Sequence, residues 1–237
     1  MKYANVVMGR FLDRPNRFIA HVEFDGVVET VHVKNTGRCR ELLQPGCPAY
    51  LSVSDNPARK TKYDLIAVEK QMNDGSGLLV NMDSQIVNDA AEEWLRAGAL
   101  FGPEAKIRRE VFCGASRFDF AVEEQGRPSY LEVKGVTLEQ NGIASFPDAP
   151  TERGVKHLRE LTECARRGIG AYVLFVVQMK RIRYLRPNDR MHQEFGEALR
   201  EAAQAGVRIL AMDCIVTPES IVIDATIPVD LTRKEGD

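Results

Sequence analysis

The chain has 237 residues, of which 44% are hydrophobic, which suffices for one large or two small globular domains with buried cores. Its formal net charge of −2 excludes a protein that binds nucleic acid through a uniformly basic surface. The first 82 residues hold 11 basic and 9 acidic side chains and the remainder holds 21 and 25, so we expect any basic surface to be local and to favour the N-terminal part.

Cysteine and histidine spacing argues against disulfides and zinc. The five cysteines are odd in number and form no C-x-x-C pair, and the four histidines form no ligand-spaced pair. The N-terminus lacks the apolar run of a signal peptide, and the longest apolar run, 171–177, is too short to span a bilayer. The sequence therefore predicts a soluble cytoplasmic protein with reduced thiols and no membrane partner.

Residues 1–82 have the pattern of a small β-barrel of the OB type. Asp25-Gly26 lies between two alternating runs and is a strong hairpin signal. Short strands with turn residues between them suit a closed or partly open barrel. The expected strands are 4–12, 17–24, 27–34, 47–53, 63–70 and 78–82.

Three basic groups on this barrel are candidates for phosphate contacts. Such groups bind a polyanion by neutralising its backbone charge, although a solvated surface is the more common explanation for any one such group taken alone. Gly37 in the second group could allow a turn that exposes backbone N–H groups. The groups are Arg10, Arg14 and Arg17; Arg38 and Arg40; and Arg59, Lys60 and Lys62.

Residues 83–237 alternate helical and strand patterns, which predicts a mixed-sheet α/β domain. A first helix, capped by Ser84 or Asn88, should end near Ala97, before Gly98. The order that follows is three strands, a helix and a buried strand. The expected elements are strand 107–113, a hairpin within 116–136, loop 139–150, helix 151–167, strand 171–177, helix 190–205, and strands 207–212 and 221–227.

The hairpin within 116–136 brings charged side chains together. If its turn centres between Gln125 and Gly126, Asp119 faces Glu132 across the pair of strands. Lys134 then projects from the same face as Glu132, and the neighbouring apolar residues point the other way. Two opposed carboxylates repel each other, so we expect a positive charge between them. The apolar residues assigned to the opposite face are Phe118, Phe120, Leu131 and Val133.

This constellation resembles the PD-(D/E)xK nuclease site, with Phe118 at the position of the proline. The resemblance implies that Asp119 and Glu132 hold Mg²⁺ or Mn²⁺ and that Lys134 acts on the phosphate. Such folds usually supply a further carboxylate from the first helix. Asp89 best matches that acidic position; Glu92 and Glu93 remain open, and acids in a first turn also stabilise a helix without any metal. Glu110 matches a further acidic position in the proteins that this chain resembles. It is either a group that supports the metal site or an ordinary outward-facing strand residue.

Four blocks resemble the signature of the sugar fermentation stimulation protein A (SfsA) family. The resemblance implies an N-terminal OB-like barrel (1–82), a C-terminal PD-(D/E)xK nuclease-like domain (83–237) and DNA binding. Arg38 and Arg40 fall in the first block. Arg153, Lys156 and His157, in the last block, are assigned to the polar face of their helix, where they could clamp phosphate near the site or simply be solvated. The blocks are NTGRCRELL (35–43), GASRFDF (114–120), YLEVKGVTL (130–138) and FPDAPTERGVKHLREL (146–161).

The sequence thus supports a DNA-binding protein with a divalent-metal-dependent phosphodiesterase site. The alternative is a non-cleaving, largely sequence-nonspecific DNA-binding regulator of sugar (maltose-type) metabolism genes, which the family's association with sugar use favours. Single-stranded and double-stranded DNA, and a monomer and a homodimer, are all compatible with the residues.

Overall fold

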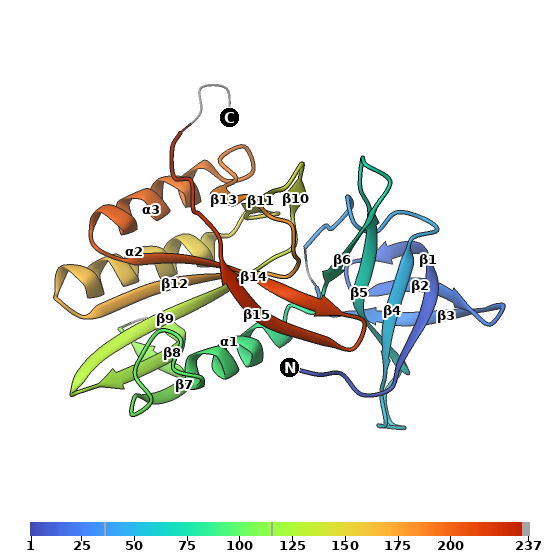
Figure 1. The fold of residues 1–237 in the computed structure, drawn as a ribbon, viewed down its shortest axis with the longest axis horizontal. Coiled ribbons are helices and arrows are strands. Elements are labelled where there is room, and N and C mark those ends of the chain that lie inside the picture. Colours follow the sequence, from blue (N-terminus) through green and yellow to red (C-terminus); the bar gives the residue numbers. More distant parts are fainter. Residues whose placement is uncertain (36, 115, 234–237) are drawn as a thin grey trace.

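The first six strands form a barrel in the computed structural model, which describes residues 1–35, 37–114 and 116–233. The sheet order is β3-β2-β1-β4-β5-β6, and a further parallel pairing of β3 with β5 closes five of these strands into a ring (Figure 1). The predicted OB-like barrel is confirmed. The strands are β1 (Val6–Asn16), β2 (Ile19–Phe24), β3 (Val27–Val33), β4 (Pro48–Val53), β5 (Tyr63–Gln71) and β6 (Gly77–Asn81).

Turn chemistry sets the register of the barrel. Asp25 and Gly26 both have positive φ, +50° and +75°, as a two-residue hairpin turn requires, and Phe24 pairs with Val27 across them. Alternate residues of β2 are therefore buried, including Ala20 and Val22.

The second domain is built on a six-stranded mixed sheet. The order is β15-β14-β12-β9-β8-β7, in which β9, β12 and β14 run parallel and the edges are antiparallel. The strands are β7 (Lys106–Cys113), β8 (Ser116–Glu124), β9 (Arg127–Val136), β12 (Gly170–Val177), β14 (Arg208–Thr217) and β15 (Ser220–Thr226).

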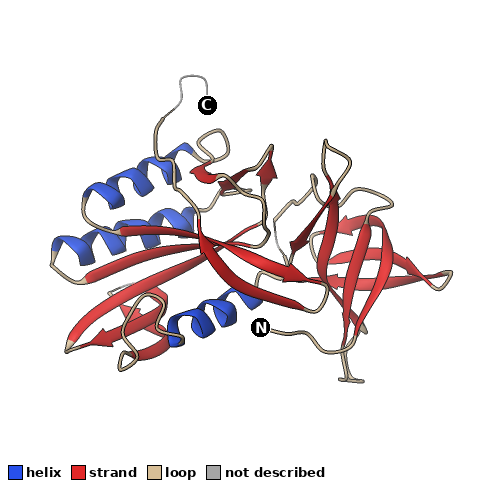
Figure 2. Cartoon of the chain, in the orientation of Figure 1, coloured by secondary structure: helices blue, strands red, loops and turns tan. Residues whose placement is uncertain are grey.

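Helices cover both faces of this sheet, and all belong to the second domain (Figure 2). Helix α1 (Ile86–Arg96) packs on one face, and helices α2 (Glu152–Arg166) and α3 (Gln193–Gln204) pack on the other (Figure 1). The first helix ends near Ala97 as predicted, with Gly98 at φ +78°. Its cap was predicted wrongly, because the Asp83 carboxylate accepts the N–H groups of Gln85 and Ile86.

The segment predicted as a loop over 139–150 contains two short strands. Strand β10 (Glu139–Gln140) pairs with β11 (Ile143–Phe146), and β11 runs parallel to β13 (Tyr184–Pro187) in a small separate sheet. Strands this short carry too little periodicity for the sequence to reveal them, and the pairing of β11 with β13 is a long-range contact.

Buried polar contacts join the two domains. The Gln178 side-chain amide donates to the carbonyl and side-chain oxygens of Asn81 at 3.1 and 2.9 Å and to the carbonyl of Asp83 at 3.1 Å. The barrel therefore lies at the ends of β12 and β9, where each parallel strand finishes. Within the described residues, no helix is long and apolar enough to cross a membrane.

Candidate functional site

The β8–β9 hairpin has the register predicted from its turn. Gln125 and Gly126 have positive φ, and the ladder pairs Glu124 with Arg127 and continues to Phe120 with Leu131. One step further, Asp119 falls opposite Glu132, where regular pairing ends. There Asp119 Oδ2 accepts the backbone N–H of Val133 at 2.8 Å, so a carboxylate takes the place of a strand carbonyl.

One expectation for this hairpin was wrong. Phe118 and Phe120 were predicted to share a face, but Phe118 packs in the core beneath α2 and Phe120 in the core beneath α1. Regular alternation ends at Asp119, and Glu110 on the neighbouring strand has φ of +53°. The Glu110 side chain is exposed and lies 3.5 Å from Arg117, so its contact is an ion pair on the surface.

Glu132 is almost completely buried and has one free oxygen. Its Oε1 accepts from Lys134 Nζ at 2.5 Å and from His157 Nδ1 at 2.5 Å. Its Oε2 has no hydrogen-bond partner within 1–35, 37–114 and 116–233. A buried carboxylate oxygen without a partner is costly, so its presence calls for an explanation, such as a bound ion.

The two carboxylates influence each other's ionisation. Burial, followed by the negative charge of Glu132, raises the pKa of Asp119. Burial also acts to raise the pKa of Glu132, but the hydrogen bond from His157 and the charge of Lys134 outweigh it, and the net pKa is lowered. The site thus holds one firmly ionised carboxylate beside a second that is destabilised by it.

The sequence reasoning missed the burial of His157 and its contact with Glu132. His157 was assigned to the polar face of α2, but it is only 4% exposed and its ring packs edge-on to Phe118. Arg153 Nε donates to His157 Nε2 at 3.4 Å, which leaves the Nδ1 proton directed at Glu132. Its spacing of four and seven residues from the buried Leu161 and Cys164 was the signal available in the sequence.

Helix α1 turns an amide toward the site. Asn88 Nδ2 donates to Asp119 Oδ1 at 3.0 Å. The carboxylates considered on this helix lie elsewhere: Asp89 and Glu92 pair with Arg109 at 2.6 and 3.0 Å, and Glu93 pairs with the N-terminal amine at 2.6 Å. Asp89, the third carboxylate expected at the metal site, is therefore engaged in a partly exposed ion pair with Arg109.

The predicted DNA-contacting residues are on the surface of both domains. Arg38 and Arg40 are exposed on the barrel, and Arg153 and Lys156 are exposed on α2. Arg14, by contrast, donates to the backbone carbonyls of Arg17, Asn35, Gly37 and Arg38, so it organises this loop.

Gly37 serves close packing between the domains. A Cβ there would lie 1.9 Å from Asp148 Oδ2, and the Gly37 N–H is already bonded to Asn35 Oδ1 at 2.8 Å. The predicted turn with free N–H groups is therefore replaced by an Asx turn held against Asp148.

A polar cavity of about 280 Å³ opens between the domains beside the site. It lies beyond the carboxyl ends of β9 and β12, the position where open α/β sheets commonly bind ligands. Gly135, the residue after Lys134, forms part of its wall, so the cavity and the carboxylate site are neighbours. The other lining residues include Asn35, Gly37, Ser84, Thr137, Ser145, Asp148, Thr151 and Gln178.

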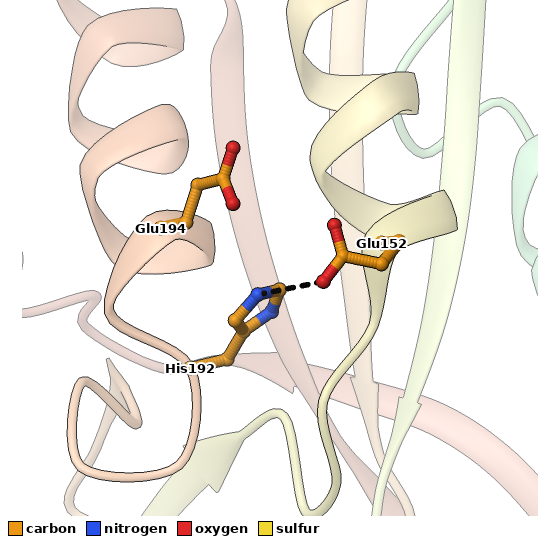
Figure 3. Close-up of side chains that lie close together, drawn as sticks. All are labelled: Glu152, His192 and Glu194. Carbon is orange, nitrogen blue, oxygen red and sulfur yellow. Dashed lines mark ion pairs between the residues drawn. The ribbon is translucent and has the colours of Figure 1, made fainter.

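A second cluster, Glu152, His192 and Glu194, has ligand atoms within 4.8 Å of one another (Figure 3). His192 Nδ1 accepts the Thr151 N–H at 3.3 Å, so Nε2 carries the proton and points at Glu152, 3.4 Å away. Glu194 is bonded to Arg159 at 2.6 Å. The His192 nitrogen that faces the two glutamates is thus a hydrogen-bond donor. The three side chains hold the N-termini of α2 and α3 together.

Comparison with known proteins places these features in one family. The SfsA N-terminal OB domain matches residues 12–81, and the sugar fermentation stimulation protein RE domain matches residues 85–220. The chain belongs to the SfsA family.

Relatives in the SfsA family align over nearly the whole chain. A sugar fermentation stimulation protein homolog of Desulfitobacterium hafniense is 55% identical over 93% of this chain and 94% of its own. One from Ruminiclostridium cellulolyticum is 51% identical over 98% of this chain and 100% of its own. The solved structure of Pyrococcus furiosus SfsA in complex with Ca²⁺ superposes with a TM-score of 0.84 at 28% identity, covering 97% of this chain and 98% of that one.

Proposed function

We propose that this SfsA-family protein is a DNA-binding protein whose second domain hydrolyses phosphodiesters with a divalent metal ion. The observation that carries the proposal is the buried, unpartnered Oε2 of Glu132 beside Asp119. A cation there would supply the missing partner and relieve the repulsion from Glu132 that, after burial, raises the pKa of Asp119.

The donor set fits a hard cation. Asp119 and Glu132 offer carboxylate oxygens, and the side-chain N–H of Asn88 holds Asp119 Oδ1 in place. Mg²⁺ and Mn²⁺ prefer such oxygen ligands, as does Ca²⁺, which is present in the Pyrococcus furiosus SfsA complex. When bound, such an ion supplies Lewis-acid activation of the phosphoryl group and lowers the pKa of a bound water.

The remaining residues have separate roles in this proposal. Lys134, held at 2.5 Å from Glu132, stabilises the negative charge that develops on the phosphate. His157 holds Glu132 Oε1 and thereby leaves Oε2 for the ion. Exposed Arg38 and Arg40 on the barrel, with Arg153 and Lys156 on α2, neutralise the DNA backbone.

Hydrolysis of plasmid and single-stranded DNA with Mg²⁺ or Mn²⁺ tests this function. Glu132→Gln, Asp119→Asn and Lys134→Ala are each expected to lower the rate by a factor of about 10²–10⁴, since each removes a group that acts on the phosphate or the ion. Glu163→Gln, at an exposed carboxylate paired with Arg166, is the matched control and should retain the wild-type rate. Cutting that persists in all three site variants would refute the assignment.

Asp89→Asn decides the role of the third carboxylate in the same assay. A loss comparable to that of Glu132→Gln would mean that Asp89 leaves Arg109 to join the metal site when DNA binds. An unchanged rate would assign it to the surface ion pair with Arg109.

A non-cleaving DNA-binding regulator is the second candidate. It is favoured by the engagement of Asp89 and Glu92 with Arg109, which leaves two carboxylates at the site. DNA binding that is unchanged by a chelator and by Glu132→Gln, with no cutting under any metal, would support it. In either case the double variant Arg38→Ala, Arg40→Ala should weaken DNA binding. The slope of log K against log salt concentration should fall by the amount expected for the loss of about two phosphate contacts.

A further inference from the structure

Two of the five cysteines lie next to each other across the fold. Cys113 ends β7, and Cys164 is in the last third of α2, 51 positions later in the chain. Their Sγ atoms are 3.9 Å apart. The other three cysteines, Cys39, Cys47 and Cys214, make no such contact in the part of the chain that the structure describes.

The pair differs in access to solvent. Cys164 is only 4% exposed and packs in the core beneath α2, whereas Cys113 is partly exposed at the end of an edge strand. Burial raises the pKa of the Cys164 thiol to about 11, so Cys113 is the thiol that meets a reagent first. Cys113 is also the last residue of β7, which is an edge strand of the sheet.

We propose that Cys113 and Cys164 form a reversible disulfide when the protein meets a low-molecular-weight disulfide. The Cys113 thiolate attacks one sulfur of the reagent, which forms a mixed disulfide and releases one thiolate. Cys164 then gives up its proton and attacks the Cys113 sulfur, and the second reagent thiol leaves. Two cysteine thiols are oxidised and one reagent disulfide is reduced to two thiols.

The bond would join β7, the neighbour of β8 in the sheet, to α2. Cys113 precedes β8, which carries Asp119, and Cys164 lies two turns beyond His157 on α2, the residue bonded to Glu132. Oxidation therefore locks β7 and β8 to α2. The inference rests on the thiol geometry and stands independently of any nuclease activity.

Incubation of the full chain with oxidised glutathione, followed by peptide mapping without reductant, tests the proposal. The expected product is one Cys113–Cys164 crosslink that dithiothreitol removes, with Cys39 and Cys214 still reduced because they are buried. Cys164→Ala should instead accumulate glutathione on Cys113, and Cys113→Ser should leave Cys164 unmodified. Free thiols at both positions, or a crosslink of Cys113 to another cysteine, would overturn it.

Thermal unfolding of the wild-type protein is a second test, and it does not require any variant to fold. Because the crosslink closes a loop of 51 residues, the oxidised wild type should melt about 5–10 °C above the reduced protein. A lower Tm after oxidation would show that the native fold does not accommodate the bond and would equally refute the proposal.

Discussion

At the scale of single residues, His157 determines how Glu132 is presented. A buried carboxylate could satisfy both its oxygens, but Lys134 and His157 both donate to Oε1, and Oε2 is left over. Arg153 completes the chain by donating to the far nitrogen of the ring. His157 is thus a positioning residue that acts through Glu132.

His157→Ala should weaken Mn²⁺ binding roughly 10- to 100-fold, because Glu132 loses one of its two fixed donors. His157→Gln keeps a donor N–H near the same place and should recover most of the affinity. Isothermal titration of the three proteins with Mn²⁺ measures this. Equal losses in the alanine and glutamine variants would mean that the ring matters for packing alone.

Asp119 is expected to limit the stability of the metal-free protein. Its pKa is raised by burial and by Glu132, so at neutral pH its ionised form is disfavoured in the folded state. Asp119→Asn removes that charge and should raise the Tm of the metal-free protein at pH 7.

The size of this stabilisation depends on pH. As pH falls through the raised folded pKa, the wild-type carboxyl takes up a proton in the folded state and the penalty disappears; it is gone below the ordinary value of 3.8. The two melting curves should therefore converge in acid. A wild type that is more stable than Asp119→Asn at pH 7 without metal would contradict this account.

At the scale of elements, the closure of the barrel depends on a buried charge. Asp64 on β5 lies opposite His32 on β3 and accepts from Arg59 at 2.5 and 2.9 Å, with Lys34 3.4 Å away. Burial acts to raise the pKa of Asp64, but the hydrogen bonds from Arg59 and His32 outweigh it and lower the pKa to about 2. The parallel β3–β5 pairing that completes the ring is thus held by an ionised carboxylate.

The folded barrel should lose stability in acid as Asp64 becomes protonated. Because the folded pKa is about 2 and the ordinary value is 3.8, about 2 kcal/mol present above pH 4 is lost as pH falls toward 2. Asp64→Asn should lack this loss and be less stable than wild type at pH 7. Urea unfolding from pH 2 to 7 measures both, with exposed Asp55→Asn as the control. Parallel pH profiles for wild type and Asp64→Asn would count against the assignment.

At the scale of the whole molecule, the domains share buried polar contacts. Lys70 of β5 donates to the carboxylate of Glu139 and, at 2.7 Å, to its carbonyl, and Glu139 Oε1 accepts the Gly142 N–H at 2.6 Å. With side chains 16% and 1% exposed, this pair joins the barrel to the small sheet of the second domain. The cavity beside the candidate site depends on the domain placement that such contacts fix.

Glu139→Gln should cost about 3 kcal/mol of unfolding free energy, since it leaves the Lys70 ammonium buried without its counter-charge. Adding Lys70→Met should recover most of the loss by removing the orphaned charge. Glu123→Gln, in the exposed Lys106–Glu123 pair, is the matched control, with an expected cost below about 0.5 kcal/mol. Equal costs for the buried and exposed pairs in urea titrations would show that the interdomain contact adds nothing.

The architecture and half of the site followed from local patterns. Turn residues such as Asp25-Gly26 and Gln125-Gly126 fix hairpin registers, and register places Asp119 opposite Glu132 because strand side chains alternate with a period of two. Lys134, two residues on, forms the predicted contact with Glu132. The pairing of β10 with β11 and of β11 with β13 was missed because the strands are short and β13 is distant in the sequence.

Turns and periodicity act over a few residues, so they specified the order of the main strands and helices and the opposition of two acids beside a lysine, but not the short strands β10, β11 and β13. Tertiary structure alone decided that His157 holds Glu132, that Asn88 faces Asp119 while Asp89 pairs with Arg109, and that Cys113 meets Cys164. Each of these contacts joins residues 20 to 51 positions apart and depends on how a helix settles on the sheet or how a strand pairs, which no local pattern specifies.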